Sequence, residues 1–563
     1  MSDDVATPDG VADSGPPNQG RRKLWVAAGV AGITGIVGLA ALGGVAARDD
    51  SPGTPRSDAQ ANARQNVSDA GPADDAGGMG KDSKGEDDRS GDDRRGKDDR
   101  RDHKGKAKDV PCHTDKLIQA IVHANETGGG VLELAKGCTY ELTRSEHGNG
   151  LPVIKESVVL KGHDTRIVRA ATADYFRILN VGRGGHLTLK HVTVKGGQTE
   201  ARKMVPPPTA GLAPSGATTA ASAPVTRPAL AAPRPAATAA PEVSPAPATG
   251  GGPAAAAPKG TPAPAPDIAP TVSPLGSVDG AGILVQRGGT ADIEHSWIVQ
   301  NHAGLNGGGI ANYGTTNIRK SSVERNSAAV FGGGVFNAGV LRVEDSKIEY
   351  NSAGAAGGGI ANGSAPNGFT GGGGTVWVWK SKIDHNRAGV GGGLYDNHGT
   401  TTLTQSQVNG NTGTEDVGGI FVEDAGKLYL ERVLVAGNFT DGLVGGVGVE
   451  QATAVIEHSL IKENESRQSS GGLGNFIGFV TLQDTEIVAN RATGPGAQGG
   501  GIFNQGGVTT LVRTKVAHNY ADQPPGGIWT SNDGVKIDKK SAVKDNRPTN
   551  CQGSPVIPDN CFG

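Results

Sequence analysis

The chain has 563 residues, of which 91 are glycine, 33 are proline and only 4% are aromatic. Its formal net charge of −3 gives no overall electrostatic bias toward nucleic acid or an anionic membrane surface. Nucleic acid is therefore not expected as a partner. The length would allow several domains, but an internal repeat joins most of the chain into one elongated body.

The first expected element is a membrane-spanning helix. Residues 1–23 are polar and form a short cytoplasmic tail without expected structure, and residues 24–47 follow as an uncharged apolar run long enough to cross a bilayer. Three basic residues at 21–23 predict that the N-terminus lies inside the cell and the C-terminal region outside. A cleaved signal peptide is the alternative, because residues 45–47 read Val-Ala-Ala, an acceptable cleavage site. In both cases the rest of the chain is exported.

Residues 48–110 are expected to form a disordered linker. Between Lys81 and Asp109 the sequence mixes 11 Lys or Arg residues with 10 Asp or Glu residues. Such a tract cannot bury a core, so it stays solvated and extended. A nucleic-acid patch is a weak interpretation of its basic residues, because acidic residues interleave with them and no aromatic side chain is present to stack on bases.

The chain's cysteines lie at the two ends of the expected folded part, 111–563, and they are Cys112, Cys138, Cys551 and Cys561. Export favours disulfide bonds. Three pairings are possible, and the most economical joins the two cysteines at each end. Between the first two, Thr114 can cap a short helix that the glycines at 128–130 stop, and this helix is expected to cover the open first coil.

Most of the remaining sequence is a repeat with a nearly constant period. Asparagines recur at spacings of 25 to 29 residues, with one spacing of 35; they are Asn301, Asn326, Asn351, Asn386, Asn411, Asn438, Asn464, Asn490, Asn519 and Asn546. An aliphatic residue after paired glycines forms a second column, from Ile283 to Ile528. Short runs with alternating apolar residues separate these columns, which predicts strands. A unit of about 26 residues accommodates three short strands and three turns, one coil of a parallel β-helix.

Stacking of coils explains the columns. Each asparagine is expected to bond the backbone of its own turn and the asparagine of the next coil, in a ladder of buried amides. Small hydroxyl residues five positions earlier, such as Ser321 and Ser346, fit an inward corner. The repeated Asn-x-Gly, as at Asn312 to Gly314, predicts another turn in which positive φ is needed.

The segment CHTDKLIQAIVHANETGGGVLELAKGCTYELT, followed by the repeats with paired glycines, resembles secreted bacterial right-handed parallel β-helix repeat proteins of the pectate-lyase-like superfamily. The repeats are also similar to those of chlamydial polymorphic outer-membrane proteins. The resemblance covers about 111–563 and implies an all-β, right-handed parallel β-helix solenoid. It is specific for fold rather than function, because this scaffold hosts lyases, hydrolases, adhesins and tailspikes.

One long insertion interrupts the repeat at about 198–277. Gly197 occupies the ladder position and Gly280 begins the return to the next strand, while residues 205–274 contain 18 Pro and 22 Ala. This composition favours an extended, disordered external loop in place of a turn. A smaller glycine-rich loop at 363–374 accounts for the 35-residue spacing.

Counting back from each asparagine identifies outward-facing positions. Trp377 and Trp379 are expected to project from one strand, with Tyr429 two coils further on and with Arg342 and Glu344 one coil before. Exposed aromatics in a chain with so few of them favour a glycan-binding platform, because sugars stack on such faces. The competing interpretation is that one of the two loops packs over the tryptophans.

Two columns of acidic residues are alternative candidate sites. Glu431 and Glu457 fall on adjacent coils at a spacing that would suit a retaining glycosidase. The column Glu324, Glu349 and Asp384 could offer oxygen ligands to Ca²⁺. Solvated surface carboxylates are the more common explanation for both, so no catalytic residue, metal site or cofactor is predicted.

The expected function is therefore non-catalytic binding of a glycan or a surface partner by a single-pass, membrane-tethered extracellular β-helix. A cell-wall or environmental polysaccharide is the expected ligand. The alternative is a polysaccharide lyase or glycoside hydrolase, although no catalytic signature of the superfamily is found in the repeats.

Overall fold

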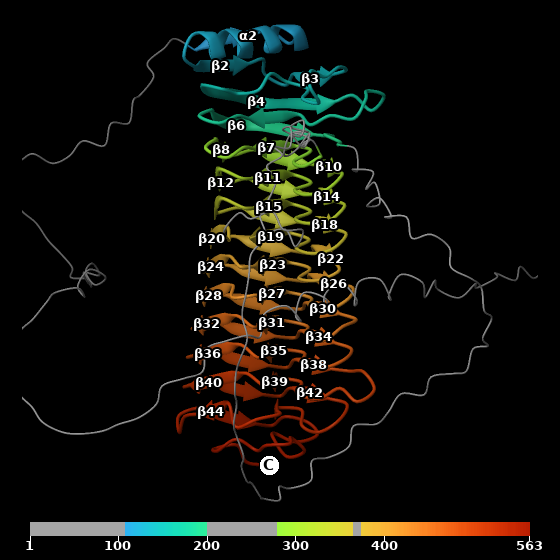
Figure 1. The fold of residues 1–563 in the computed structure, drawn as a ribbon, viewed down its shortest axis with the longest axis vertical. Helices are drawn as coiled ribbons and strands as arrows, with labels where there is room; N and C mark the ends of the chain where they lie inside the picture. The colour runs from blue at the N-terminus through green and yellow to red at the C-terminus, as the bar shows by residue number, and fades with distance from the viewer. Residues whose placement is uncertain (1–106, 200–277, 364–372) are drawn as a thin grey trace, which may run out of the picture. The chain divides into compact units, whose positions relative to one another are not determined.

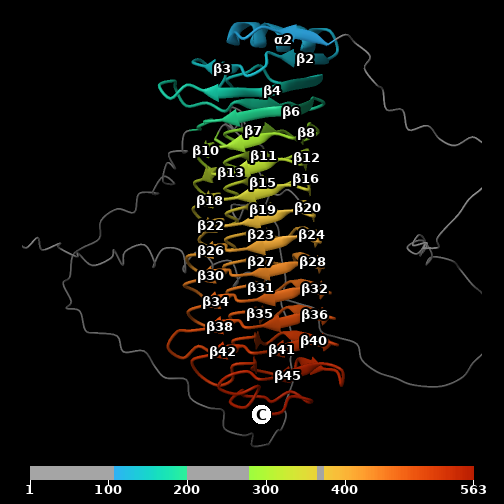
Figure 2. The ribbon, with the colours of Figure 1, turned by 180° about the vertical axis from the view of Figure 1, so that it is seen from behind.

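The computed structural model describes residues 107–199, 278–363 and 373–563. These residues form a parallel β-solenoid with very little helix, as Figures 1 and 2 show from opposite sides. Strand pairing between successive coils is parallel throughout, with Ile310 opposite Val335 and Val335 opposite Ile360. The expected all-β parallel fold is thus confirmed.

The N-terminal part is less regular than the repeats. It consists of β1 (Lys108–Val110), α2 (Thr114–Glu126), β2 (Gly130–Leu134), β3 (Thr139–Leu142), β4 (Ser157–Arg169), β5 (Leu179–Val181) and β6 (His186–Lys195). Helix α2 lies at the end of the stack (Figure 1) and contacts β1, β3 and β4. The apolar side chains of Leu117 and Ile121 are fully buried, because they recur at helical spacing on its inner side.

One coil of the repeat region shows the arrangement that the other coils follow. It runs through β11 (Ile310–Asn312), β12 (Thr315–Arg319), β13 (Ser322–Glu324) and β14 (Ser327–Ala328). Strand β11 belongs to an 11-stranded sheet, β12 and β13 to a 25-stranded sheet, and β14 to a nine-stranded sheet. Each described coil after β6 repeats this pattern wholly or in part.

The 11-stranded sheet contains β5, β7 (Ile283–Val285), β11, β15 (Val335–Asn337), β19 (Ile360–Gly363), β23 (Leu394–Asn397), β27 (Ile420–Glu423), β31 (Val447–Glu450), β35 (Leu473–Phe476), β39 (Ile502–Gln505) and β43 (Ile528–Thr530). The nine-stranded sheet contains β10 (His302–Ala303), β14, β18 (Ser352–Ala353), β22 (Arg387–Ala388), β26 (Thr412–Gly413), β30 (Phe439–Thr440), β34 (Glu465–Ser466), β38 (Arg491–Ala492) and β42 (Tyr520–Ala521).

The 25-stranded sheet includes β1, β2, β3, β4 and β6, and in the repeats each coil adds two strands to it. The first strands of these pairs are β8 (Thr290–Glu294), β12, β16 (Val340–Glu344), β20 (Thr375–Trp379), β24 (Thr400–Thr404), β28 (Lys427–Glu431), β32 (Thr453–Glu457), β36 (Phe479–Gln483), β40 (Val508–Val512) and β44 (Val535–Ile537). The second strands are β9 (Trp297–Val299), β13, β17 (Lys347–Glu349), β21 (Lys382–Asp384), β25 (Gln407–Asn409), β29 (Leu434–Ala436), β33 (Leu460–Lys462), β37 (Glu486–Val488), β41 (Lys515–Ala517) and β45 (Ala542–Lys544).

The core is one continuous apolar column inside the coils. The predicted inward positions are all buried: Ile318, Val343, Val378, Leu403, Leu430 and Ile456. Because side chains alternate between the two faces of a strand, their neighbours point outward. The counting rule derived from the asparagine column is confirmed.

The asparagine ladder is present, with partners that differ in part from those expected. The Asn438 amide nitrogen donates to Asn464 Oδ1 at 2.8 Å and to the Val408 carbonyl at 3.0 Å. Its Oδ1 accepts from the backbone N–H and the side-chain amide of Asn411. The backbone groups that bond the Asn438 side chain therefore lie on a neighbouring coil rather than on its own turn. One side-chain amide thus connects its own coil to the coils on both sides.

The Asn-x-Gly glycines do not have positive φ, so that prediction was wrong. A Cβ atom at Gly314 would lie 2.3 Å from the Gly289 carbonyl oxygen, and one at Gly339 would lie 2.1 Å from the Gly314 oxygen. Glycine is required there because successive coils approach too closely for any side chain.

A second internal ladder was not predicted. Asn312 donates to Asn337, Asn337 to Asn362, and Asn362 to Asp396, at 2.7, 2.7 and 2.9 Å. Asp396 also accepts from the Gly399 N–H and the Thr401 hydroxyl, so an acceptor-only side chain ends this run of donors. Burial raises the pKa of Asp396 to about 6.

Disulfide bonds join Cys112 to Cys138 and Cys551 to Cys561, the pairing that the sequence favoured. In the described ranges no helix has the length and apolar character needed to cross a bilayer. The predicted span at 24–47, nearly all of the predicted linker at 48–110, and nearly all of the insertion at 198–277 lie outside those ranges.

Candidate functional site

The predicted aromatic platform lies on the outer face of the 25-stranded sheet. Trp377 and Trp379 of β20 are 40% and 37% exposed, and Tyr429 of β28 is 40% exposed. Strand register places Trp377 opposite Thr402, and Thr402 opposite Tyr429. Trp377 and Tyr429 thus share one column, separated by two coil spacings or about 10 Å.

The two predicted polar partners lie on the expected coil, but their contacts were not foreseen. Arg342 and Glu344 of β16 do lie opposite Trp377 and Trp379, one coil before. However, the Arg342 guanidinium lies over the Trp377 ring, 4.7 Å from its centroid. Lys380, which the sequence analysis did not single out, lies 4.1 Å from the centroid of the Trp379 ring. Each tryptophan therefore has a cation against its π-face, an attractive arrangement.

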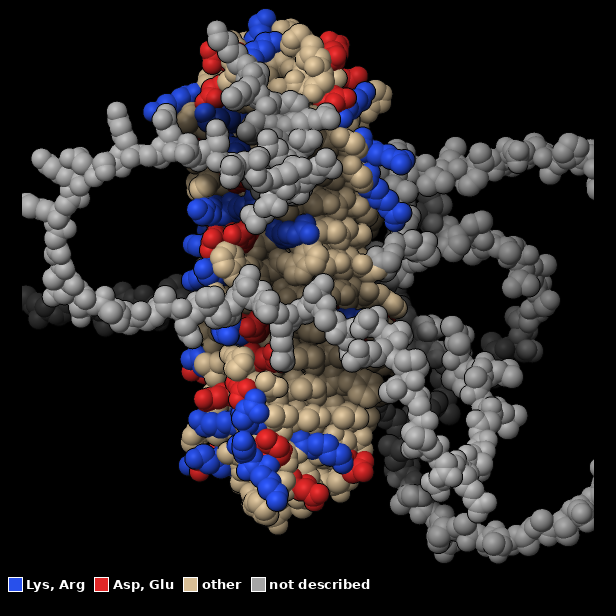
Figure 3. All heavy atoms as spheres, turned by 90° about the vertical axis from the view of Figure 1, so that its left-hand side faces the viewer, with Lys and Arg blue, Asp and Glu red and all other residues tan. Residues whose placement is uncertain are grey.

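Glu344 has a different role from Arg342. One of its carboxylate oxygens lies 3.4 Å from Nε of Arg319, on the preceding coil. Figure 3 views the solenoid from the side that carries β20 and β28, and basic and acidic side chains alternate there without forming a patch of one sign. The platform is thus an aromatic surface with mixed charges around it.

Neither acidic column provides strong support for catalysis or for a metal site. Glu431 and Glu457 are opposite each other, as predicted, but Glu431 lies 2.6 Å from the Arg432 guanidinium. Asp384 was expected to face outward with Glu349 and is instead 8% exposed, and burial raises its pKa. Throughout the described ranges no three His, Cys, Asp or Glu side chains are grouped so that they could hold a metal ion.

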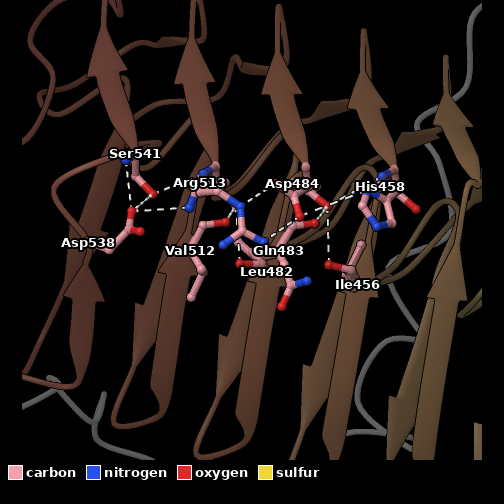
Figure 4. A network of polar contacts seen from close by, with 12 residues as sticks. Ile456, His458, Leu482, Gln483, Asp484, Val512, Arg513, Asp538 and Ser541 are labelled. Atoms are coloured by element: carbon pink, nitrogen blue, oxygen red, sulfur yellow. Dashed lines mark hydrogen bonds and ion pairs between the residues drawn. The ribbon is translucent and has the colours of Figure 1, made fainter. Parts of the chain in front are cut away.

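A polar network crosses the coils at the C-terminal end of the stack (Figure 4). Arg513 donates two hydrogen bonds to the Asp484 carboxylate, at 2.6 and 2.7 Å, and these bonds lower the pKa of Asp484. His458 lies on the other side of Asp484, and Asp538 accepts from the Arg513 backbone N–H. One residue per coil contributes, which makes the network a lateral tie between turns.

The 11-stranded sheet carries an aromatic column that the sequence analysis missed. From β7 onward its outward positions follow the inward aliphatic residue of each strand, and they are Leu284, Ala311, Phe336, Ala361, Tyr395, Phe421, Gly448, Gly474, Phe503 and Trp529. The Phe503 and Trp529 rings stack with centroids 4.1 Å apart. At two consecutive coils the column position is occupied by glycine, Gly448 and Gly474, which have no side chain.

A surface hollow of about 280 Å³ is lined in part by Phe421 and Phe476, the two rings that lie against these glycines; we call it the glycine hollow. Its lining residues are Asp416, Val417, Phe421, Leu443, Glu450, Phe476, Ile477 and Gln505. A Cβ atom at Gly448 would lie 3.0 Å from the Phe421 ring, and one at Gly474 would lie 3.0 Å from the Phe476 ring. The glycines therefore allow two aromatic rings to lie along the sheet.

Two carboxylates, those of Asp416 and Glu450, line the glycine hollow, and the carboxylate of Glu423 lies close to both. Glu423 and Glu450 are directly opposite on β27 and β31, and Asp416 lies on the turn before β27. Burial is the main cause that raises the pKa of each carboxyl, to about 6 for Asp416. Their mutual repulsion adds to this effect, since Glu423 raises the pKa of Asp416, and both raise that of Glu450.

The sequence signal for this hollow was the change from large aromatic residues to glycine at successive outward positions of the 11-stranded sheet. Reading the residue after each inward aliphatic position would have shown aromatic residues replaced by Gly448 and Gly474. The paired glycines and the aliphatic column by themselves indicate only scaffold, and the signal lies one position further along each strand.

No family model matches the chain, and no curated protein matches it. A solved structure to which the chain is similar is a mutant tailspike protein of the E. coli bacteriophage HK620 in complex with a hexasaccharide. The identity is 11%, the match covers 76% of this chain and 62% of the tailspike chain, and the TM-score is 0.33. A likeness this distant carries no argument about function, so the proposals below rest on the side chains described above.

Proposed function

We propose that the chain binds a glycan on the outer face of the 25-stranded sheet, through Trp377, Trp379 and Tyr429, without cleaving it. The observation that carries this proposal is the register of three half-exposed aromatic side chains on one face. Their spacing of about 10 Å along the column is comparable to two sugar rings. Aromatic faces of this kind stack on the apolar faces of sugars.

The cations stacked on the two tryptophan rings limit the ways in which a sugar could contact those rings. Arg342 and Lys380 cover one face of each tryptophan ring, so a glycan either displaces them or lies beside them. A guanidinium held in this position offers several N–H donors to sugar hydroxyls or carboxylates. Arg342 is therefore proposed to bind the ligand together with the rings.

The proposal places the solenoid outside the cell, tethered by the apolar run at 24–47. Both disulfides support an exported location, because such bonds persist in oxidising compartments. Protease added to intact cells should cut the linker at 48–110 and release the solenoid. Release from untreated cells, with a mature N-terminus at Arg48, would instead indicate a cleaved signal peptide.

The binding test is a glycan-array screen of the full chain, followed by titration of any hit. Replacing both tryptophans, Trp377→Ala and Trp379→Ala, should weaken binding by about 1–2 kcal/mol for each ring that the ligand desolvates. The matched control is Trp297→Ala, because Trp297 of β9 is 48% exposed and lies outside the platform.

A double variant that folds and binds normally would exclude the platform as the binding site. Unfolding of the double variant would show that the tryptophans pack beneath other parts of the chain. The alternative function, a polysaccharide lyase or glycoside hydrolase, would be recognised by new reducing ends in any bound glycan.

A further inference from the structure

The carboxylates in and beside the glycine hollow are not neutralised by ion pairs. In the described part of the chain, no ion pair with Lys, Arg or His is formed by Asp416, Glu423 or Glu450. Polar contacts to the three are the Leu443 N–H donating to Asp416, and Tyr395 and Asn397 donating to Glu423. Gathering carboxylates in this way is unfavourable unless a cation accompanies them.

The hollow combines apolar and polar walls, and this combination decides what kind of cation would suit it. The apolar lining consists of Phe421, Phe476, Val417, Leu443 and Ile477, with Ile477 63% exposed, and Gln505 lies with the two carboxylates on the polar side. A small divalent ion prefers a shell of oxygen ligands, and in the described ranges no three acidic, His or Cys side chains are grouped to provide one. An organic cation can place its charge near the carboxylates and its carbon atoms against the rings.

We propose that the glycine hollow binds an alkylammonium group, held between the carboxylates of Asp416 and Glu450 and the rings of Phe421 and Phe476, with Glu423 adding negative charge from the adjacent strand position. This site is independent of the tryptophan platform, because it belongs to the 11-stranded sheet rather than the 25-stranded sheet. Quaternary ammonium groups are recognised elsewhere by similar combinations of aromatic faces and negative charge. The volume of about 280 Å³ is close to the lower end for small-molecule pockets.

The sign of the pH dependence follows from the titratable groups in and around the hollow. They are Glu415 and Asp416 before β27, Glu423 and Asp424 at its end, Glu450 on β31, and Tyr395 and His398 on and after β23. The cation binds the ionised carboxylates. Because burial raises the pKa of Asp416 to about 6, affinity should be greatest above this value and should fall as pH decreases through it.

The test uses the full chain and ligand-observed NMR titrations at low salt. One arm uses choline, a second uses butylammonium as a mimic of a lysine side chain, and a third uses the neutral isostere of choline in which carbon replaces nitrogen. Saturable binding of at least one ammonium compound, and none of the neutral isostere, is expected. Comparison of the first two arms shows whether a methylated or a primary ammonium group is preferred.

Matched variants on a single coil make the test specific. Glu450→Gln should weaken ammonium binding about tenfold, the effect of removing one nearby charge. Glu457→Gln makes the same change on the same coil but on the 25-stranded sheet, and it should leave the affinity unchanged. Thermal unfolding of both variants checks that they fold.

Three results would overturn the proposal: no saturation by either ammonium compound in the millimolar range, equal binding of the neutral isostere, or equal affinity of the Glu450→Gln variant and the native chain. If Glu450→Gln does not fold, Phe476→Leu provides the second variant. It keeps the charges and removes a ring, so it should weaken binding of the ammonium compound, and unchanged affinity would count against the site.

Discussion

At the scale of single residues, the solenoid depends on left-handed turns that are mostly occupied by residues other than glycine. The residue before each ladder asparagine has positive φ, as at Arg325, Tyr350 and Ala489. Glycine occupies the same place at Gly410 and Gly437. An L-residue in this region carries a steric cost, which the stacked coils impose on most turns.

Ala489 is the position where this cost can be measured most simply, because its side chain is exposed and its φ is 57°. Ala489→Gly should raise the free energy of unfolding by about 0.5–1 kcal/mol, since relief of backbone strain exceeds the added entropy of the unfolded chain. Urea denaturation of both proteins measures the difference.

The control is Ala329→Gly, which changes an exposed alanine without positive φ. It should lower stability by roughly 0.5–1 kcal/mol, the ordinary effect of introducing glycine. Equal effects of the two substitutions would contradict the claim that the turn before Asn490 is strained.

Asn438 tests the ladder itself. Asn438→Leu removes the acceptor of the Asn411 N–H and the donor to Val408, which leaves buried groups without partners. The expected loss is about 1–3 kcal/mol for each orphaned group. The loss would be seen as a lower melting temperature, and unchanged melting would mean that the amide contributes little.

At the scale of the strand, β27 and β31 bring carboxylates to places where the fold disfavours their ionisation. Asp416 has a pKa raised to about 6 in the folded state, above that of an ordinary aspartate. The folded chain therefore binds this proton more tightly than the unfolded chain. Stability contributed by the protonated form is fully present below the unfolded pKa and is lost as pH rises through about 6.

Asp416→Asn should remove this loss, because an amide can still accept the Leu443 N–H without carrying charge. The variant should gain stability over the native chain as pH increases from about 4 to about 7. Urea unfolding midpoints across this interval measure the gain. Asp533→Asn, at an exposed turn position, is the control and should show no such trend.

Strands β16, β20 and β28 show what the sequence could and could not predict. The asparagine column determines the register, so Trp377, Trp379 and Tyr429 were placed correctly on one outer face. The stacking of Arg342 on Trp377 depends on rotamers and on the neighbouring coil, which a counting rule does not include. The glycine hollow was missed because glycine within a repeat was interpreted only as a requirement of the backbone.

At the scale of the whole solenoid, each coil contacts mainly its neighbours, so the two ends are the weakest points. The last ladder residue, Asn546, donates to Asn550, and the adjacent Cys551 is bonded to Cys561. Breaking this bond removes a constraint that closes a short loop, typically an effect of about 2–4 kcal/mol.

Changing both cysteines, Cys551→Ser and Cys561→Ser, should therefore open the C-terminal coils and leave the middle of the stack intact. Hydrogen exchange should become faster in β43, β44 and β45, with β23 and β27 unchanged. Uniform acceleration through all coils would show instead that the solenoid unfolds as one cooperative unit.

The site where the long insertion leaves and rejoins the coil has a consequence for how such a protein can be altered. The Thr199 hydroxyl donates to the Val278 carbonyl at 2.7 Å, and the Gly197 N–H bonds to Asn301 as a ladder residue would. The described residues on either side of 200–277, Thr199 and Val278, thus meet at a single point of the coil. That point is a natural graft point: a foreign domain, a tag or a shorter peptide could be exchanged there while the stacking of the coils stays the same.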